Sequence, residues 1–242
     1  MRTSRHTISW AGALAPASLA TFIVVTCAVA SAVSVGAVAP ARADAGRTQA
    51  QAKASAATRP RIVFLGDSLT AGYGLERHQS VPSLIQARLD STGYRYEVVN
   101  AGVSGDTSAG GLSRLDWSLS GDVQVLVVEL GANDGLRGLP VAAMKNNLEQ
   151  IIKRARQRGI TVLLTGMEAP PNYGAAYTKE FRQVFQDLAQ THKVPFVPFF
   201  LQGVAGIPSL NISDGIHPNP AGARIVEATM WRALQPLLTK PR

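Results

Sequence analysis

The sequence predicts an α/β fold, a three-layer α/β/α sandwich around a mostly parallel sheet of five strands. The first observation is that short apolar runs alternate with helical patterns from about residue 60 onward, which is typical of consecutive βαβ units. The second is that these runs are continuously apolar, as in parallel strands that helices cover on both faces. Right-handed crossovers between such strands place helices on both sides of the sheet.

Each expected strand is a short apolar run that leads into a polar or glycine-containing segment. The five runs are Arg61–Leu65, Tyr96–Asn100, Val123–Leu130, Ile160–Thr165 and Val194–Val197. The segments between and after them predict helices over Val81–Asp90, Thr107–Ser118, Val141–Gln157, Ala176–His192 and Pro220–Leu238. Asn219 suits the cap of the last helix because its side chain accepts from free backbone N–H groups, and Pro220 suits the first helical position.

Residues 1–43 have the organisation of a secretory signal peptide. Arg2 and Arg5 precede an uncharged stretch from Ile8 to Ala39, and Ala41-Arg42-Ala43 offers a cleavage site between small residues. Residues 44–59, rich in Ala, Gln, Thr and Ser, are expected to form a flexible linker. Residues 60–242 then form one folded domain, and we expect a periplasmic or secreted protein.

Two alternatives to a cleaved leader are an uncleaved anchor and a lipoprotein. The stretch from Thr21 to Ala39 is nearly long enough to span a bilayer, so an uncleaved anchor stays open. A lipoprotein would be modified on Cys27, but Thr26 stands before it where a small Gly or Ala is expected. The lipoprotein is therefore the weaker alternative.

Charge and cysteine content exclude several classes of protein. The net charge is +8, but three of the arginines lie in the leader and the other basic residues are scattered. The densest basic cluster, residues 153–158, ends a predicted helix, where cations favour the helix dipole, so no nucleic-acid partner is expected. Cys27 is the only cysteine, which excludes a disulfide framework and a cysteine zinc site. A domain of this size buries a sufficient core by itself, and we expect a monomer.

Polar, glycine-containing segments follow the expected strands. They are Gly66-Asp67-Ser68, Gly102 to Asp106, Gly131-Ala132-Asn133-Asp134, Glu168 to Gly174, and Asp214-Gly215-Ile216-His217 in the last long loop. The carboxyl ends of parallel strands meet at one edge of the sheet, and ligands of such folds bind there. Together these segments predict a site at that edge, which is stronger evidence than any one of them.

Hydrolysis by a serine needs a base, a group that orients the base, and donors for the oxyanion. Among the four histidines, only His217 has a carboxylate at short spacing in a strand-end loop. A single tight turn can bring Asp214 to Nδ1 of His217 and leave Nε2 free for a nucleophile. Ser68 follows the first strand at once, so its hydroxyl is expected at the sheet edge. By itself, each of these features also suits an ordinary turn or helix cap.

Four short sequence blocks resemble those of the GDSL, or SGNH, hydrolases. The blocks are Gly66-Asp67-Ser68-Leu69, the segment around Gly105, Gly131-Ala132-Asn133-Asp134, and Asp214-Gly215-Ile216-His217-Pro218. They occur in the family's order and cover about residues 60–240. Ser104 to Thr107, Asn133 to Gly138 and Pro171 to Gly174 look like the arylesterase, acyl-CoA thioesterase I and lysophospholipase L1 subgroup. The resemblance implies a flavodoxin-like arrangement of the sheet and the hydrolysis of carboxylic esters and thioesters.

The resemblance also implies a role for each matching residue. Ser68 would be the nucleophile, His217 the base and then the acid, and Asp214 the group that orients His217. The backbone N–H groups of Ser68 and Gly105 and the side-chain amide of Asn133 would form the oxyanion hole. No metal and no cofactor is required.

The substrate is expected to be a small-molecule acyl ester or thioester, such as an aryl ester or a lysophospholipid, with a medium or long acyl chain. Apolar residues in the strand-end loops could line an acyl groove: Leu69, Leu136, Pro170, Tyr173 and Ile216. The same residues could equally pack the loops. Contact with a membrane is expected only through the leader or a lipid substrate. Two alternatives stay open, a carbohydrate acetyl esterase with the same site and a non-catalytic, membrane-tethered binding module.

Overall fold

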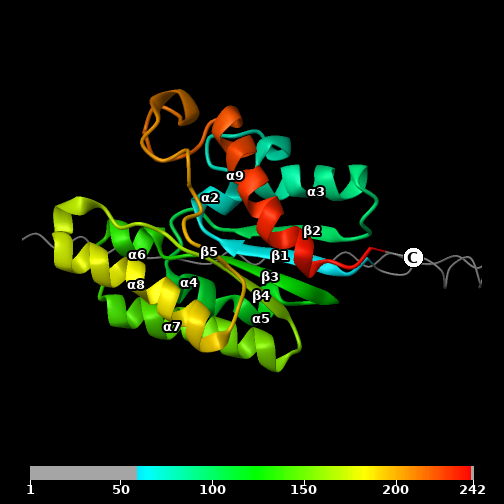
Figure 1. The fold of residues 1–242 in the computed structure, drawn as a ribbon, viewed down its shortest axis with the longest axis horizontal. Helices are drawn as coiled ribbons and strands as arrows, with labels where there is room; N and C mark the ends of the chain where they lie inside the picture. The colour runs from blue at the N-terminus through cyan, green and yellow to red at the C-terminus, as the bar shows by residue number, and fades with distance from the viewer. Residues whose placement is uncertain (1–58, 241–242) are drawn as a thin grey trace, which may run out of the picture. The chain divides into compact units, whose positions relative to one another are not determined.

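The computed structural model describes residues 59–240 of the chain (Figure 1). The strands are β1 (Arg61–Gly66), β2 (Glu97–Gly102), β3 (Val123–Glu129), β4 (Thr161–Thr165) and β5 (Phe196–Val197). The helices are α2 (Ser68–Ala71), α3 (Val81–Ser91), α4 (Ser108–Ser113), α5 (Leu115–Ser118), α6 (Ala132–Leu136), α7 (Val141–Gln157), α8 (Ala175–His192) and α9 (Pro220–Leu234). Short 3-10 turns are η1 (Arg77–Gln79), η2 (Pro171–Tyr173), η3 (Pro208–Leu210) and η4 (Gln235–Leu237).

The five strands form one parallel sheet in the order β2-β1-β3-β4-β5. The chain enters the sheet at β1, moves outward to β2 and then returns past β1 to β3. The direction of winding therefore reverses between β1 and β3, and this is the point where open α/β sheets bind ligands. The predicted fold class is confirmed.

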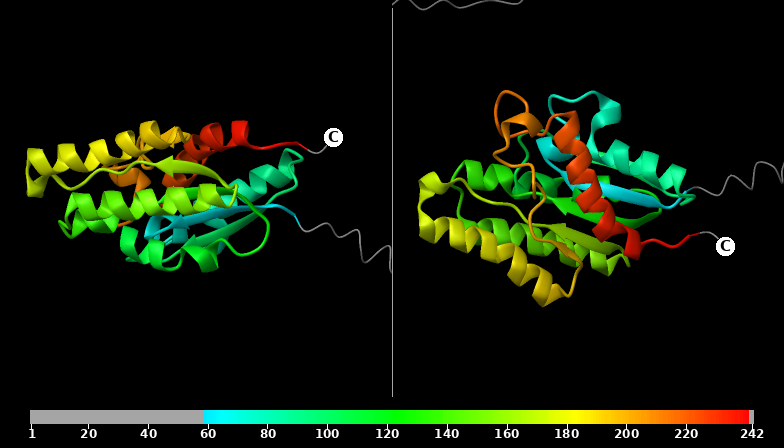
Figure 2. Two further views of the ribbon diagram at one scale, coloured as in Figure 1. Left: turned by 90° about the horizontal axis from the view of Figure 1, so that it is seen from below. Right: turned by 45° about the horizontal axis from the view of Figure 1, so that its top comes forward.

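Helices cover both faces of the sheet. Helices α3 and α9 lie on one face, and α4, α7 and α8 lie on the other (Figures 1 and 2). The central strands β1 and β3 are almost wholly buried between these layers, because their continuous apolar runs have no polar face to offer water. The loops that follow β1 and β3 therefore extend from the two most buried strands of the sheet.

The expected helix Thr107–Ser118 is interrupted at Arg114. The guanidinium of Arg114 donates to the backbone oxygens of Gly66 and Ala101, at 2.8 and 2.6 Å, and to the Asp106 carboxylate at 2.6 Å. These acceptors lie at the ends of β1 and β2, so the side chain ties two strand ends to the Asp106 loop. The last expected helix is also shorter, because the chain tightens into η4 before Leu238.

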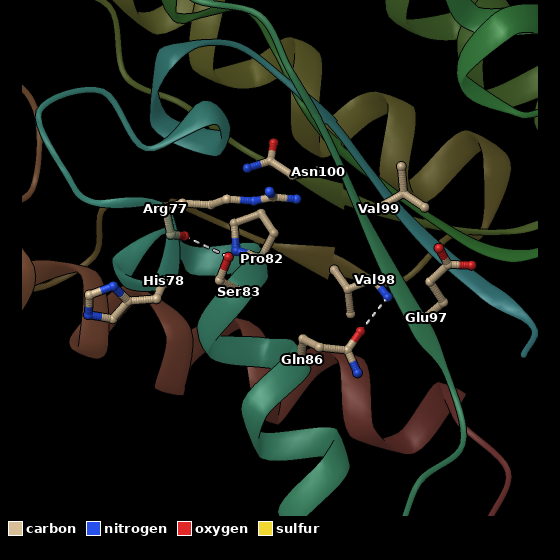
Figure 3. A pocket seen from close by; sticks show the side chains of 9 residues that line it. All are labelled: Arg77, His78, Pro82, Ser83, Gln86, Glu97, Val98, Val99 and Asn100. Carbon is tan, nitrogen blue, oxygen red and sulfur yellow. Dashed lines mark hydrogen bonds between the residues drawn. The ribbon is translucent and has the colours of Figure 1, made fainter.

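The expectation that helices cover every strand on both faces is wrong for β2. Most residues of this edge strand are exposed or half-buried, and only Ala101 is buried. The side chain of Gln86 lies against its outer edge, where it accepts from the Val98 N–H at 2.7 Å and donates to the Tyr96 oxygen at 3.2 Å (Figure 3). Paired edge groups do not offer a template for a further strand.

A cavity of about 660 Å³ lies beside Gln86, and none of the predicted site residues line it.

The expected signal peptide, residues 1–43, and almost all of the expected linker 44–59 lie outside the described residues. Within residues 59–240, no helix has both the length and the hydropathy that a membrane crossing requires.

Candidate active site

Ser68 is the first residue of α2, directly after β1. Asp67 caps this short helix, and its Oδ1 accepts from the Leu69 N–H at 3.0 Å. A Cβ atom on Gly66 would lie 2.0 Å from Oγ1 of Thr70, so only glycine allows the chain to turn so closely. The turn leaves Ser68 half-buried at the carboxyl edge of the sheet, while the residues on either side of it are buried.

Three of the predicted side chains, Ser68, His217 and Asp214, form a hydrogen-bonded triad. Oγ of Ser68 lies 2.8 Å from Nε2 of His217. Nδ1 of His217 lies 2.6 Å from Oδ2 of Asp214. With Nδ1–H donated to the carboxylate, Nε2 is the acceptor that can take the serine proton. The structure therefore brings Ser68, which is 149 residues away in the chain, to the predicted Asp-x-x-His pair.

The loop before α9 holds the histidine in place. It is the orange segment beside α2 in Figure 1. The N–H of Ile212 donates to the His217 oxygen at 2.8 Å, and Asn211 forms an isolated bridge with Pro218. The buried amide of Asn211 donates to the backbone oxygens of Val204 and Ile207, both at 2.8 Å. Such pairing of loop backbone restricts the position of the imidazole.

The hydrogen bonds around Asp214 keep its carboxylate ionised. Loss of water around it alone would raise its pKa, but the N–H groups of His217 and Ile216 and the His217 ring outweigh this effect and lower the pKa to about 2. An ionised carboxylate both fixes the tautomer of His217 and stabilises the imidazolium that forms when His217 accepts a proton.

Asn133 lies on α6, shortly after β3, and its side chain points toward the turn that carries Ser68. Its Nδ2 donates to Oδ2 of Asp67 at 3.1 Å. Gly131 adopts a left-handed conformation with φ +115°, which lets the chain turn from β3 into α6 within two residues. The strand order places β3 beside β1, so Asn133 and Ser68 leave neighbouring strand ends.

Two backbone N–H groups at this edge are free to bind an anion. Within residues 59–240, neither Ser68 nor Gly105 uses its N–H in a hydrogen bond. Gly105 has φ +83°, a conformation that disfavours other residues. The side chain of Arg137 donates to the Gly105 oxygen at 2.8 Å and so holds the following peptide, between Gly105 and Asp106.

The residues expected to line an acyl groove have different surroundings. Leu136 and Tyr173 are exposed, and the Tyr173 hydroxyl donates to the Leu136 oxygen at 2.9 Å. Pro170 is half-buried just before η2, and Ile216 is exposed beside the triad. Leu69 does not fit the expectation, because only 6% of it is exposed and it belongs to the hydrophobic core. As the second residue of α2, its side chain packs inward and supports the Ser68 turn from below.

One aromatic neighbour of the triad was not predicted. The ring of Tyr73 lies 4.7 Å from that of His217, centroid to centroid, and Tyr73 is exposed. Its position just after α2 was the only available signal. Within residues 59–240, no group of three or more His, Cys, Asp or Glu side chains could hold a metal ion.

Known proteins that are similar to this chain are named as esterases and thioesterases. Residues 64–225 match the GDSL-like lipase/acylhydrolase family. The chain is 45% identical over 183 residues to the esterase TesA of Pseudomonas aeruginosa, covering 75% of this chain and 91% of that protein. It is 39% identical to the arylesterase of Vibrio mimicus, covering 72% and 84%. It is 37% identical to thioesterase 1/protease 1/lysophospholipase L1 of Escherichia coli K12, covering 76% and 87%.

Solved structures give the same grouping. The crystal structure of TesA superposes with a TM-score of 0.71 at 44% identity, over 74% of this chain and 99% of that one. The psychrotrophic esterase EstA of Pseudoalteromonas, solved in a form inhibited by monoethylphosphonate, has a TM-score of 0.70 at 34% identity, over 73% and 97%. The order of the four blocks, the parallel sheet and these similarities agree, and the chain belongs to the GDSL-like lipase/acylhydrolase family.

Proposed function

We propose that the protein is a serine hydrolase that cleaves carboxylic esters and thioesters through an acyl-enzyme on Ser68. The observation that carries the proposal is the chain of hydrogen bonds from Ser68 through His217 to Asp214. Its geometry suits a hydroxyl that loses its proton to a histidine as it attacks. The names of the relatives, esterase, arylesterase and thioesterase/lysophospholipase, support the same class of reaction.

In the first half of the reaction, Oγ of Ser68 attacks the carbonyl carbon while Nε2 of His217 takes its proton. The carbonyl oxygen becomes an anion, which the N–H groups of Ser68 and Gly105 and the Asn133 amide stabilise. The imidazolium then gives its proton to the leaving oxygen or sulfur. The products are a free alcohol or thiol and an ester on Ser68.

In the second half, water replaces the leaving group. Nε2 of His217 takes a proton from the water as its oxygen attacks the acyl carbon, and the same donors bind the new oxyanion. Collapse of this intermediate breaks the bond to Ser68, and His217 returns the proton to Oγ. The acid is released and the site regains its starting state.

A chain-length series of p-nitrophenyl esters and the matching thioesters, assayed on purified protein, tests the substrate class. Exposed apolar side chains in the strand-end loops, Ile216 among them, favour medium or long acyl chains, because each buried methylene contributes about 0.8 kcal/mol. We expect kcat/KM to rise from acetyl to octanoyl esters. A clear preference for acetyl groups would favour the carbohydrate acetyl esterase instead, and no turnover of any member would favour the binding module.

Ile216 is expected to select acyl chains by length. It lies between the two triad residues of the loop, is 45% exposed, and has its N–H bound to Asp214. Its side chain therefore stays close to the scissile bond. We expect Ile216→Asn to lower kcat/KM for octanoyl esters about tenfold more than for acetyl esters, because an alkyl chain would bury an unpaired amide.

Ile225→Asn is the matched control for this change, since Ile225 is also exposed, at 37%, but lies on α9. It should leave the chain-length preference unaltered. Equal losses on acetyl and octanoyl esters in Ile216→Asn would show that Ile216 only supports the loop.

We further propose export of the protein and removal of its leader. The charged start, the uncharged core and the small residues around Ala43 support cleavage. N-terminal sequencing of the protein from the periplasm or medium should then begin near Asp44 or Gly46. A chain that keeps Met1 and partitions with membranes would contradict cleavage and support the anchor.

A further inference from the structure

Two buried carboxyl groups lie beneath the nucleophile and have no role in the steps above. Asp67 precedes Ser68, and Glu129 is the last residue of β3. Both are 0% exposed. Buried carboxyl groups are costly unless they are paired or protonated, so their place under the reacting serine needs an explanation.

Glu129 is bound to the nucleophile turn through one oxygen. Oε2 accepts from the Thr70 hydroxyl at 2.8 Å and from the Asp67 N–H at 3.4 Å. The other oxygen, Oε1, is buried and has no hydrogen-bond partner among residues 59–240. Glu129 therefore holds both the start and the middle of the turn that carries Ser68.

The surroundings of Glu129 favour its neutral form. No Lys, Arg or His of residues 59–240 pairs with it, and the groups that face it are Asp67 and Thr70. Burial, and then the charge of Asp67, raise the pKa of Glu129 well above its ordinary value. Burial also raises the pKa of Asp67 to about 6, against hydrogen bonds from Leu69 and Asn133 and the charge of His217.

Asp67 connects this acid to the oxyanion site. Its Oδ2 accepts from Nδ2 of Asn133 at 3.1 Å, while Oδ1 accepts from Leu69. An amide nitrogen has two hydrogens in one plane, about 120° apart. When Asp67 takes one of them, the direction of the other is fixed, and this second N–H is the one available to a substrate oxygen.

We propose that Glu129 is a positioning residue: as a neutral acid it holds Thr70 and Asp67, and through Asp67 it fixes the Asn133 amide for the oxyanion of the transition state. This inference rests on the proposed function, because it concerns the oxyanion hole of that reaction. It adds a contact between β3 and α2 that the four sequence blocks do not contain.

The test compares three substitutions in steady-state assays with one p-nitrophenyl ester. Glu129→Leu removes both acceptors at similar volume and should lower kcat by at least about tenfold with KM within about twofold, because misplacing a donor weakens binding of the transition state more than of the substrate. Glu129→Gln keeps an acceptor for Thr70 and Asp67 and should restore most of the lost kcat. A Gln variant as impaired as the Leu variant would show that an ionised Glu129 is needed and would overturn the proposal.

A double-mutant cycle separates positioning from simple loss of structure. If Glu129 acts through Asn133, then Glu129→Leu should lower kcat by less than about threefold in an Asn133→Ala background. Multiplied losses would contradict the proposal. Should Glu129→Leu fail to fold, Thr70→Val makes the same test, since it removes only the hydroxyl that Glu129 binds. Its control is Thr165→Val, which removes another buried hydroxyl, bound to the Val128 oxygen, and should leave kcat unchanged.

Thermal stability gives a readout without substrate. A carboxyl with a raised native pKa contributes stability below its ordinary pKa and loses that contribution as the pH rises through the native value. Glu129→Gln does not titrate, so its Tm relative to wild type should be higher at about pH 8 than at about pH 5. A difference in Tm that does not change with pH would show that Glu129 has an ordinary pKa, and the neutral-acid proposal would fail.

Failure of the proposed function would be recognised separately. If Ser68→Ala kept full activity, the reaction scheme would be wrong whatever the Glu129 variants did. If Ser68→Ala were inactive while Glu129→Leu kept full kcat, the serine mechanism would stand and only the role of Glu129 would be rejected.

Discussion

Ser68→Ala and His217→Ala are each expected to lower kcat by at least about a thousandfold on a carboxylic ester. The reason is the 2.8 Å contact between Oγ of Ser68 and Nε2 of His217, which makes the two side chains one unit for proton transfer. Because neither works without the other, the double variant should be about as active as the single ones. Steady-state kinetics of the three variants measures this directly.

His78→Ala is a suitable control, since His78 lies on η1, is exposed, and its imidazole pairs with Glu76. It should keep wild-type kcat, and all variants should keep the wild-type Tm within a few degrees. A double variant whose loss equals the product of the single losses would show that Ser68 and His217 act independently.

Asn133→Ala is expected to lower kcat by about a hundredfold to a thousandfold while KM stays within about twofold. The Asn133 amide meets a full negative charge only in the transition state, so its removal affects the chemical step more than substrate binding. Its contact with Asp67 fixes the amide before substrate arrives, which adds to its effect. Kinetics with a short ester separates kcat from KM.

The control is Asn146→Ala, which removes an exposed amide from α7. It should change neither parameter. If the whole defect of Asn133→Ala lay in KM, Asn133 would be a substrate-binding residue and not an oxyanion donor.

The parts of the site that the sequence predicted depend on local patterns. The apolar run before Ser68 ends at a glycine, and only two residues separate Asp214 from His217, so each half of the hydrogen-bonded chain could be recognised within a few positions. Parallel topology then predicts that strand ends meet at one edge. The contact between Ser68 and His217 follows from these two facts together.

The parts that were missed depend on contacts between distant segments. Glu129 stands in an apolar strand, and its bond to the Asp67 N–H spans 62 residues. Arg114 looks like an ordinary helix residue, although its guanidinium binds the ends of two strands. Leu69 looked like a groove residue because it follows the nucleophile, but the direction of α2 turns it into the core. Sequence spacing does not reveal such directions.

The most direct test of a serine hydrolase built on Ser68 is titration with an organophosphonate, followed by mass spectrometry of the digested protein. The reagent reacts with a serine only when a base activates its hydroxyl. We predict one adduct for each chain, located on Ser68, with activity lost in proportion to labelling and no adduct in His217→Ala. An unlabelled Ser68 in a protein that still hydrolyses esters, or an adduct on another residue that accounts for the inactivation, would contradict the account.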